Sequence, residues 1–247
     1  AIGDFIVSLP AMEALRGGYT EVWCAEANVP LARFADRAVS IGSAGLDRLG
    51  LLPADDVVDR LRQFDSIISW YGTKREEFRE VVASLGLPFQ FLPALPDGAR
   101  HAVEHYNAQA AGLGALRPSR YPRIECPDTK RTGAVIHPFA SSSTKQVPMA
   151  AFRALARELE KAMPVWWLCG PDEKLPGAMR IDDLYELACW LRGARIYVGN
   201  DSGISHLAAA VGTPAVALFQ STDPRVWAPR GACVWVSGSP SLVLTGD

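Results

Sequence analysis

The chain has 247 residues, 49% of them hydrophobic, and a formal net charge of −2. This length allows one large domain or two small ones around a sizeable core. The charge argues against a nucleic-acid partner, because phosphate backbones are bound by grouped Lys and Arg, and the sequence has no basic run. No apolar run approaches the ~20 residues that span a bilayer, and no signal peptide is recognised.

The cysteines are five in number and scattered. None is paired in a CxxC spacing, so the sequence suggests neither a zinc knuckle nor a disulfide framework. We expect reduced thiols and a cytoplasmic protein.

Short apolar or β-branched runs alternate with amphipathic segments along the whole chain. Helices are expected at 9–18, 76–86, 150–162, 183–194 and 204–212. Strands are expected at 21–25, 38–42, 66–70, 134–138, 165–170, 195–200, 215–219 and 233–237. This order predicts an α/β fold in which helices cover both faces of parallel sheets.

A segment rich in proline and charge, residues 116–133, divides the chain into two α/β halves. We predict an N-terminal domain over residues 1–120, a linker over 121–132 and a C-terminal domain over 133–247. Clefts between such domains are frequent ligand sites.

The stretch NDSGISHLAAAVGTP, residues 200–214, joins a predicted strand to a predicted helix. Free backbone N–H groups at Ser202, Gly203 and Ile204 would point outward with the positive end of the helix dipole, an arrangement that binds phosphate. His206 lies on the first turn, within reach of an anion or a sugar hydroxyl. The alternative is structural: Asp201 or Ser202 caps the helix, and His206 is an ordinary buried or surface histidine.

A second strand-to-helix loop, in AVIHPFASSSTKQVP, carries Ser141, Ser142 and Lys145. Hydroxyls, amides and a lysine suit a phosphate, although the loop has no Walker A pattern. The alternative is a solvated serine-rich loop. A third strand ends in GPDEK, where Asp172 or Glu173 could accept the hydroxyls of a ribose or another sugar, or could belong to an ordinary acidic turn. The three elements end neighbouring strands, and a nucleotide diphosphate is the economical ligand for their shared crevice.

These residues carry a resemblance to a known family. HPFASSSTKQVP, GPDE and VGNDSGISHLAAAVGTPAVALFQSTDP, in this order and spacing, resemble the C-terminal half of the heptosyltransferases of glycosyltransferase family 9. GDFIVSLPAMEALR resembles that family's N-terminal motif, whereas residues 20–130 match only loosely. Two departures stand out: the strand that precedes Gly3 in the family is missing, and only residues 175–181 separate GPDEK from DDLYEL.

The resemblance implies a GT-B architecture of two Rossmann-like domains and a bacterial enzyme of lipopolysaccharide biosynthesis. It implies inverting transfer of a heptose, or a similar sugar, from an ADP-sugar donor to a lipopolysaccharide-core or related glycan acceptor. Asp4 would then be the catalytic base. The implied donor-binding residues are Ser141, Ser142, Lys145, Asp172, Glu173, Asp201, Ser202, Gly203 and His206.

Glycosyl transfer needs a base for the acceptor hydroxyl and a stabilised leaving diphosphate. The sequence contains no DxD pair, so we expect a metal-independent reaction with no cofactor, the ADP-sugar being a substrate. Asp4 would lie at a strand-to-helix turn; its alternative role is a helix N-cap. Membrane contact is expected only through a lipid-linked acceptor, at the inner face of the inner membrane.

Two other functions remain open at this point. One is an inactive relative that binds a nucleotide sugar without transferring it. The other is a zinc hydrolase built on HAVEH, residues 101–105, which has the H-x-x-E-H form of some zinc peptidases but no clear third ligand. The favoured alternative is that HAVEHYNAQAAGLG forms an ordinary amphipathic helix that leads to the linker.

Overall fold

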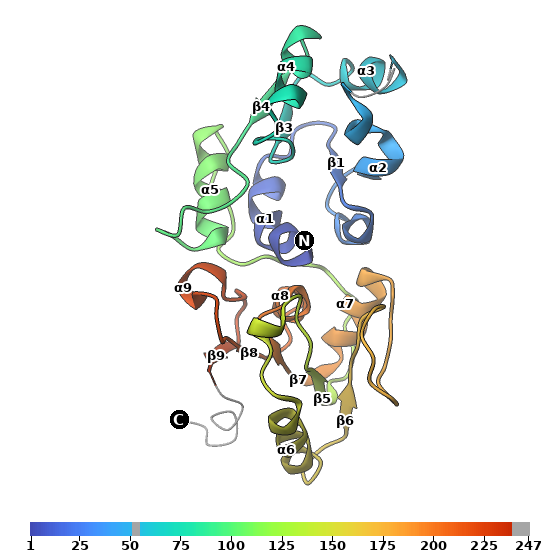
Figure 1. Ribbon diagram of the computed structural model, residues 1–247, viewed down its shortest axis with the longest axis vertical. Coiled ribbons are helices and arrows are strands. Elements are labelled where there is room, and N and C mark those ends of the chain that lie inside the picture. The colour runs from blue at the N-terminus through green and yellow to red at the C-terminus, as the bar shows by residue number, and fades with distance from the viewer. Residues whose placement is uncertain (51–54, 239–247) are drawn as a thin grey trace. The chain divides into compact units, whose positions relative to one another are not determined.

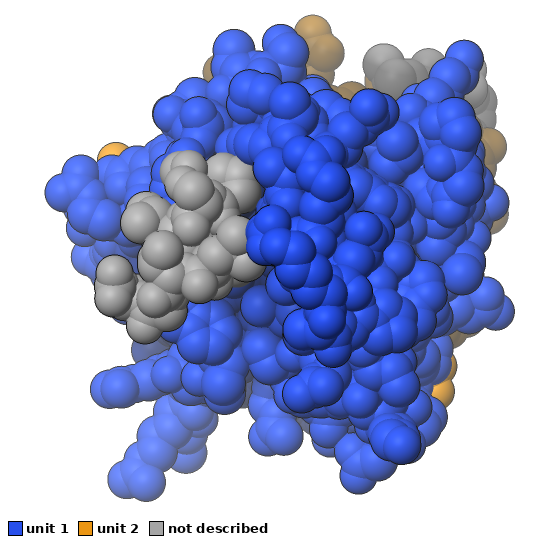
Figure 2. Space-filling view, turned by 90° about the horizontal axis from the view of Figure 1, so that it is seen from below, with its two compact units in different colours: residues 1–17, 98–247 blue, residues 18–97 orange. Residues whose placement is uncertain are grey.

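The computed structural model describes residues 1–50 and 55–238. The chain divides into two compact units, one formed by Ala1–Gly17 with Gly98–Asp247 and the other by Gly18–Asp97 (Figure 2). The domain boundaries at residues 120 and 133 remain a prediction.

The first unit is built on one parallel sheet of order β6-β5-β7-β8-β9 (Figure 1). Its strands are β5 (Thr132–His137), β6 (Val165–Trp167), β7 (Ala194–Asn200), β8 (Ala215–Leu218) and β9 (Val234–Ser237). All of β8 and the last four residues of β7 are buried. A parallel strand in the middle of a sheet is covered on both faces, which explains its continuous apolar sequence. The five strands expected in this half are confirmed.

Helices flank this sheet. The predicted ones are α6 (Met149–Leu159), α7 (Leu184–Arg192) and α8 (Gly203–Ala210), and the short α9 (Pro224–Trp227) was not predicted. Phe152 and Leu155 of α6 pack in one apolar cluster with β5, β7 and β8. Gly212 has φ +77°, and its N–H bonds to the carbonyl of Ala209, so it ends α8 as expected for a left-handed residue after a helix.

Two further helices belong to the first unit, α1 (Ile2–Ala14) and α5 (Ala102–Gly112), and they pack against each other. The helix predicted at 9–18 therefore begins at Ile2 and ends at Ala14. The prediction missed the first turns of the helix because IGDFIVSL is largely buried. A helix enclosed in this way has no apolar stripe that marks where it starts.

In the second unit, the described residues form two separate parallel strand pairs rather than one sheet. β1 (Glu21–Cys24) pairs with β2 (Arg37–Ser40), and β3 (Ile67–Ser69) pairs with β4 (Phe89–Phe91). The unit also holds α2 (Ile41–Ala44), α3 (Asp55–Leu61), α4 (Glu76–Ser84) and two 3₁₀ turns, Glu26–Leu31 and Leu46–Arg48. Its core surrounds Phe78 of α4. The strands β1 to β3 and the helix α4 were expected, whereas α3 and β4 were not.

No helix within residues 1–50 and 55–238 is both long and apolar enough to cross a membrane.

Candidate functional site

The turn between β7 and α8 lies at the carboxyl end of the strands of the first unit's sheet. Ser202 occupies the N-cap position with φ −149° and ψ 162°, but its side chain makes no capping hydrogen bond. The alternative in which Ser202 or Asp201 serves as a side-chain cap is therefore wrong. The first N–H groups of α8 have no acceptor inside their own helix, which leaves them available to an anion.

Asp201 does not point outward to a ligand as its position in the motif suggests. Its side chain is only 6% exposed, and its Oδ2 lies 2.7 Å from Lys145 Nζ. The same oxygen accepts a hydrogen bond of 2.6 Å from the Thr222 hydroxyl. Asp201 therefore fixes the ammonium group of Lys145, whose side chain is 29% exposed, beside the start of α8.

Asn200 fastens the serine-rich loop to the same strand end. Its fully buried side chain accepts a hydrogen bond from Val147 N at 3.0 Å and donates one of 2.7 Å to the carbonyl of Pro138. One amide thus binds both ends of the loop that carries Ser141, Ser142 and Lys145. Asn200 was not predicted to be a site residue. The sequence feature that could have identified it is an amide side chain at the end of a buried strand.

Within this loop, Ser142 caps a short 3₁₀ turn, Ser143–Lys145, by accepting a hydrogen bond from Thr144 N. Ser141 and Ser142 lie at the entrance of that turn. The structure therefore brings the predicted loop and the NDSG turn together at one edge of the sheet.

The helices α1 and α8 meet at their N-terminal ends through two glycines. A Cβ on Gly203 would lie 2.7 Å from Ile2 Cβ, closer than real side chains come, and 3.1 Å from Gly3 N. Gly203 is thus required for packing as well as for access to the helix amides. The contact places the first turn of α1, which contains Asp4, next to the start of α8.

His206 lies at this meeting point and is buried. A Cβ on Gly3 would be 3.3 Å from its Cδ2. Burial lowers the pKa of His206 to about 4, against a smaller opposing effect of the Asp201 charge. Its Nδ1 is buried and has no hydrogen-bond partner within the described part of the chain. At neutral pH the ring is uncharged, so its two nitrogens are one N–H donor and one acceptor, and it carries no positive charge.

Asp4 lies in the first turn of α1, not at a strand-to-helix turn as expected, and the N-cap position belongs to Ala1. The alternative of Asp4 as an N-cap is therefore wrong. Its carboxylate is 43% exposed. Burial, assisted by the charge of Asp4, raises the pKa of Tyr106 to about 12.

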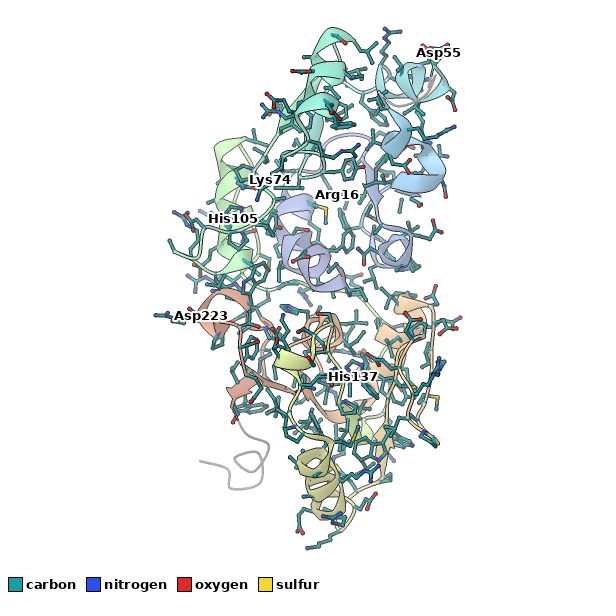
Figure 3. The ribbon with its side chains drawn as sticks, viewed as in Figure 1. Arg16, Asp55, Lys74, His105, His137 and Asp223 are labelled. Carbon is teal, nitrogen blue, oxygen red and sulfur yellow. The ribbon has the colours of Figure 1, made fainter. Side chains whose placement is uncertain are left out.

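Of the two acids in GPDEK, Asp172 is exposed and Glu173 turns toward the sheet. Oε2 of Glu173 accepts a hydrogen bond of 3.0 Å from Nε2 of His137, the last residue of β5, labelled in Figure 3. Burial raises the pKa of Glu173, whereas hydrogen bonds from His137 and from Gly170 N lower it. The lowering effects together outweigh the effect of burial, so the pKa lies below its ordinary value. The carboxylate is therefore charged at neutral pH.

The HAVEH segment has a structural role. His101 caps α5: its Nδ1 accepts a hydrogen bond from Val103 N at 3.1 Å, and its Nε2 bonds to the carbonyl of Ala228 at 2.8 Å. Both ring nitrogens are occupied, which leaves none for a zinc ion. Outside residues 51–54 and 239–247, no three His, Cys, Asp or Glu side chains are grouped as metal ligands.

The edge of the sheet thus brings together a lysine held by a buried acid, the first amides of α8 and a charged carboxylate. Comparison with known families identifies the family of the chain. The family described as glycosyltransferase family 9 (heptosyltransferase) matches residues 99–241. The chain belongs to this family.

Individual relatives agree with that assignment. Lipopolysaccharide heptosyltransferase 3 of Escherichia coli is 43% identical over 44 residues, which is 18% of this chain and 13% of that protein. The chain thus matches about an eighth of the length of this curated relative.

Solved structures share the fold at low identity. The E. coli ADP-heptose lipopolysaccharide heptosyltransferase II is 16% identical with a TM-score of 0.74, covering 98% of this chain and 93% of that one. The E. coli heptosyltransferase WaaC with ADP is 20% identical with a TM-score of 0.72, covering 98% and 95%. A family 9 glycosyltransferase from Veillonella parvula is 17% identical with a TM-score of 0.77, covering 96% and 82%. These likenesses confirm the predicted α/β, GT-B fold class.

The ion pair between Lys145 and Asp201 yields a first prediction. Because Asp201 is buried, removing Lys145 leaves its carboxylate charge without the cation that pairs with it, and such a loss is strongly destabilising. A double-mutant cycle of Lys145→Met and Asp201→Asn, measured by urea unfolding, should give a coupling free energy of about 1–3 kcal/mol.

The exposed pair Lys161 and Glu158 is the matched control, with side chains 69% and 47% exposed. Its coupling should stay below about 0.5 kcal/mol. Equal coupling for the two pairs would show that Asp201 does not hold Lys145.

His206 yields a second prediction. Its pKa is near 4 in the folded chain and 6.5 when the ring is freely solvated, so between these values the unfolded state binds the extra proton. Stability should therefore rise with pH across this window and be lost as pH falls, by on the order of 3 kcal/mol in total. His206→Gln should flatten the dependence of the unfolding free energy on pH by up to one proton. An unchanged slope in the variant would contradict the assignment.

Proposed function

We propose that this chain transfers a heptose, or a similar sugar, from an ADP-sugar donor to a lipopolysaccharide-core or related glycan acceptor, with inversion and without a metal ion. The observation that carries the proposal is the Lys145 ammonium group, held by buried Asp201 beside the N-terminus of α8. A fixed cation next to free helix amides is suited to a diphosphate that gains negative charge as it departs. Membership of glycosyltransferase family 9 supports the reaction class.

The donor would lie along the edge of the sheet at the carboxyl ends of β5, β6 and β7. The diphosphate would lie against the amides of Gly203 and Ile204 and against Lys145, with the hydroxyls of Ser141 and Ser142 beside it. The charged carboxylate of Glu173 would accept the ribose hydroxyls, a role for which it is better placed than exposed Asp172. Two of the similar structures are of WaaC with ADP and with ADP-2-deoxy-2-fluoro heptose, which supports adenine as the base.

The chemical step would be a single displacement. The acceptor hydroxyl attacks the anomeric carbon, the bond from that carbon to the diphosphate oxygen breaks, and ADP leaves with the bonding electrons. Asp4 takes the proton of the attacking hydroxyl. Attack from the face opposite the leaving group inverts the configuration at the anomeric carbon.

The charge that a metal ion supplies in some glycosyltransferases would come here from Lys145 and the helix amides. The sequence offers no DxD pair to hold such an ion. The acceptor would be a lipid-linked glycan at the inner face of the inner membrane, as the lipopolysaccharide heptosyltransferases among the relatives suggest. His206, neutral and buried, would shape the donor pocket.

The assignment of Asp4 gives a third prediction. Asp4→Asn keeps the size of the side chain but cannot take a proton, so turnover of ADP-heptose should fall by about 10²-fold or more. The Kd for ADP should change less than about twofold, because Asp4 is not a donor ligand. Turnover is measured by product formation, and the Kd for ADP is measured by calorimetric titration.

Asp59→Asn is the matched control, since this carboxylate is 74% exposed in the other compact unit. It should leave both values unchanged. Full turnover by Asp4→Asn would remove Asp4 as the base. A wild-type chain that binds ADP but never transfers sugar would identify an inactive relative instead.

A further inference from the structure

We infer that His137 is a positioning residue that fixes the Glu173 carboxylate so that one of its oxygens faces the ribose of the bound nucleotide. The inference rests on the proposed function and adds to it a residue that acts through Glu173. Its consequence is that the nucleotide site binds a ribose more tightly than a deoxyribose.

The first observation is the geometry at Glu173 Oε2. This oxygen lies 3.0 Å from Nε2 of His137 and also accepts a hydrogen bond of 2.5 Å from Gly170 N. A carboxylate only accepts hydrogen bonds, so Nε2 carries the hydrogen. Two donors converge on Oε2, and no donor within the described residues is directed at Oε1.

The second observation is the burial of the two side chains. The side chain of His137 is 4% exposed and that of Glu173 is 26% exposed. The histidine is thus enclosed at the end of β5, while the carboxylate reaches the surface of the sheet edge. A buried donor behind a half-buried acceptor determines which of the two oxygens faces outward.

The third observation is the other nitrogen of His137. Its Nδ1 is buried and has no hydrogen-bond partner among the residues that the structure describes. An unpaired buried polar atom costs free energy, and a leucine would fill the same space without one. The contribution of the histidine at this position is therefore its Nε2–H, which it donates to Glu173.

The turn around Glu173 also restrains the position of its carboxylate. Arg180 donates a hydrogen bond of 2.7 Å to the carbonyl of Glu173, which holds the backbone of the turn. A Cβ on Gly170 would lie 3.3 Å from Glu173 Oε2, so the absence of a side chain at Gly170 allows the carboxylate to pack against the backbone. Backbone and side chain are both restrained before any ligand arrives, which lowers the cost of binding.

The test compares ADP with 2′-deoxy-ADP and 3′-deoxy-ADP by calorimetric titration. Wild-type protein should bind at least one deoxy analogue about tenfold or more weakly than ADP, as expected for a lost hydrogen bond to a charged acceptor. His137→Leu should reduce this ratio to less than about threefold. His137→Gln, whose amide nitrogen can replace Nε2, should restore most of it.

A second variant reaches the carboxylate without touching the histidine. Gly170→Ala displaces Oε2 and should lower the same ratio even if His137→Leu fails to fold, which thermal melting of each variant will show. Retention of the full ratio in folded His137→Leu, or equal binding of all three nucleotides by the wild type, would overturn the inference. Wild-type protein that binds no ADP at all would instead overturn the proposed function.

Discussion

The site depends on two adjacent polar side chains that are buried where β7 ends. Asn200 binds both ends of the loop between β5 and α6, and Asp201 holds the lysine which that loop carries. Buried polar groups are stable only when they are paired, so each of these contacts restricts the loop to one conformation. The NDSG turn therefore holds the neighbouring loop in place, and its acid fixes the position of Lys145.

The positive character of the site has two sources. Lys145 contributes a full charge, and the start of α8 contributes partial charges from backbone dipoles. His206 contributes none at neutral pH, because burial holds its pKa near 4. A neutral ring lets the two helix ends approach each other through Gly3 and Gly203 without burying a further cation.

Much of the fold was predictable from the sequence because the central strands β5, β7 and β8 are largely buried and helices alternate with the strands. Every strand expected in either half has a counterpart in the structure, and Gly212 ends α8 as its position suggests. Strand β4 was not predicted, since FQF is only three residues long and lies between prolines. The start of α1 was misplaced because a largely buried helix lacks the apolar stripe on which such predictions rely.

The candidate site was predictable only as a set of residues. The loops that carry Lys145, Glu173 and the NDSG turn follow strands, so their convergence at one sheet edge follows from topology. The pairing of Lys145 with Asp201, the contact between Gly3 and Gly203, and the hydrogen bond from His137 to Glu173 join segments distant in sequence. Local periodicity contains no information about such contacts, and this is why Asp201 was expected to face the ligand.

The most direct test of the account is a thermal-shift panel of ADP, UDP, GDP and CDP, each with magnesium and with EDTA. A nucleotide at ~100 times its Kd adds about 2.7 kcal/mol, which for a chain of this size raises the melting temperature by roughly 5–10 °C. The account predicts that ADP gives this shift, that the other nucleotides give less, and that EDTA changes nothing. No shift with any nucleotide, or a shift that EDTA abolishes, would contradict a metal-independent site for an adenine diphosphate.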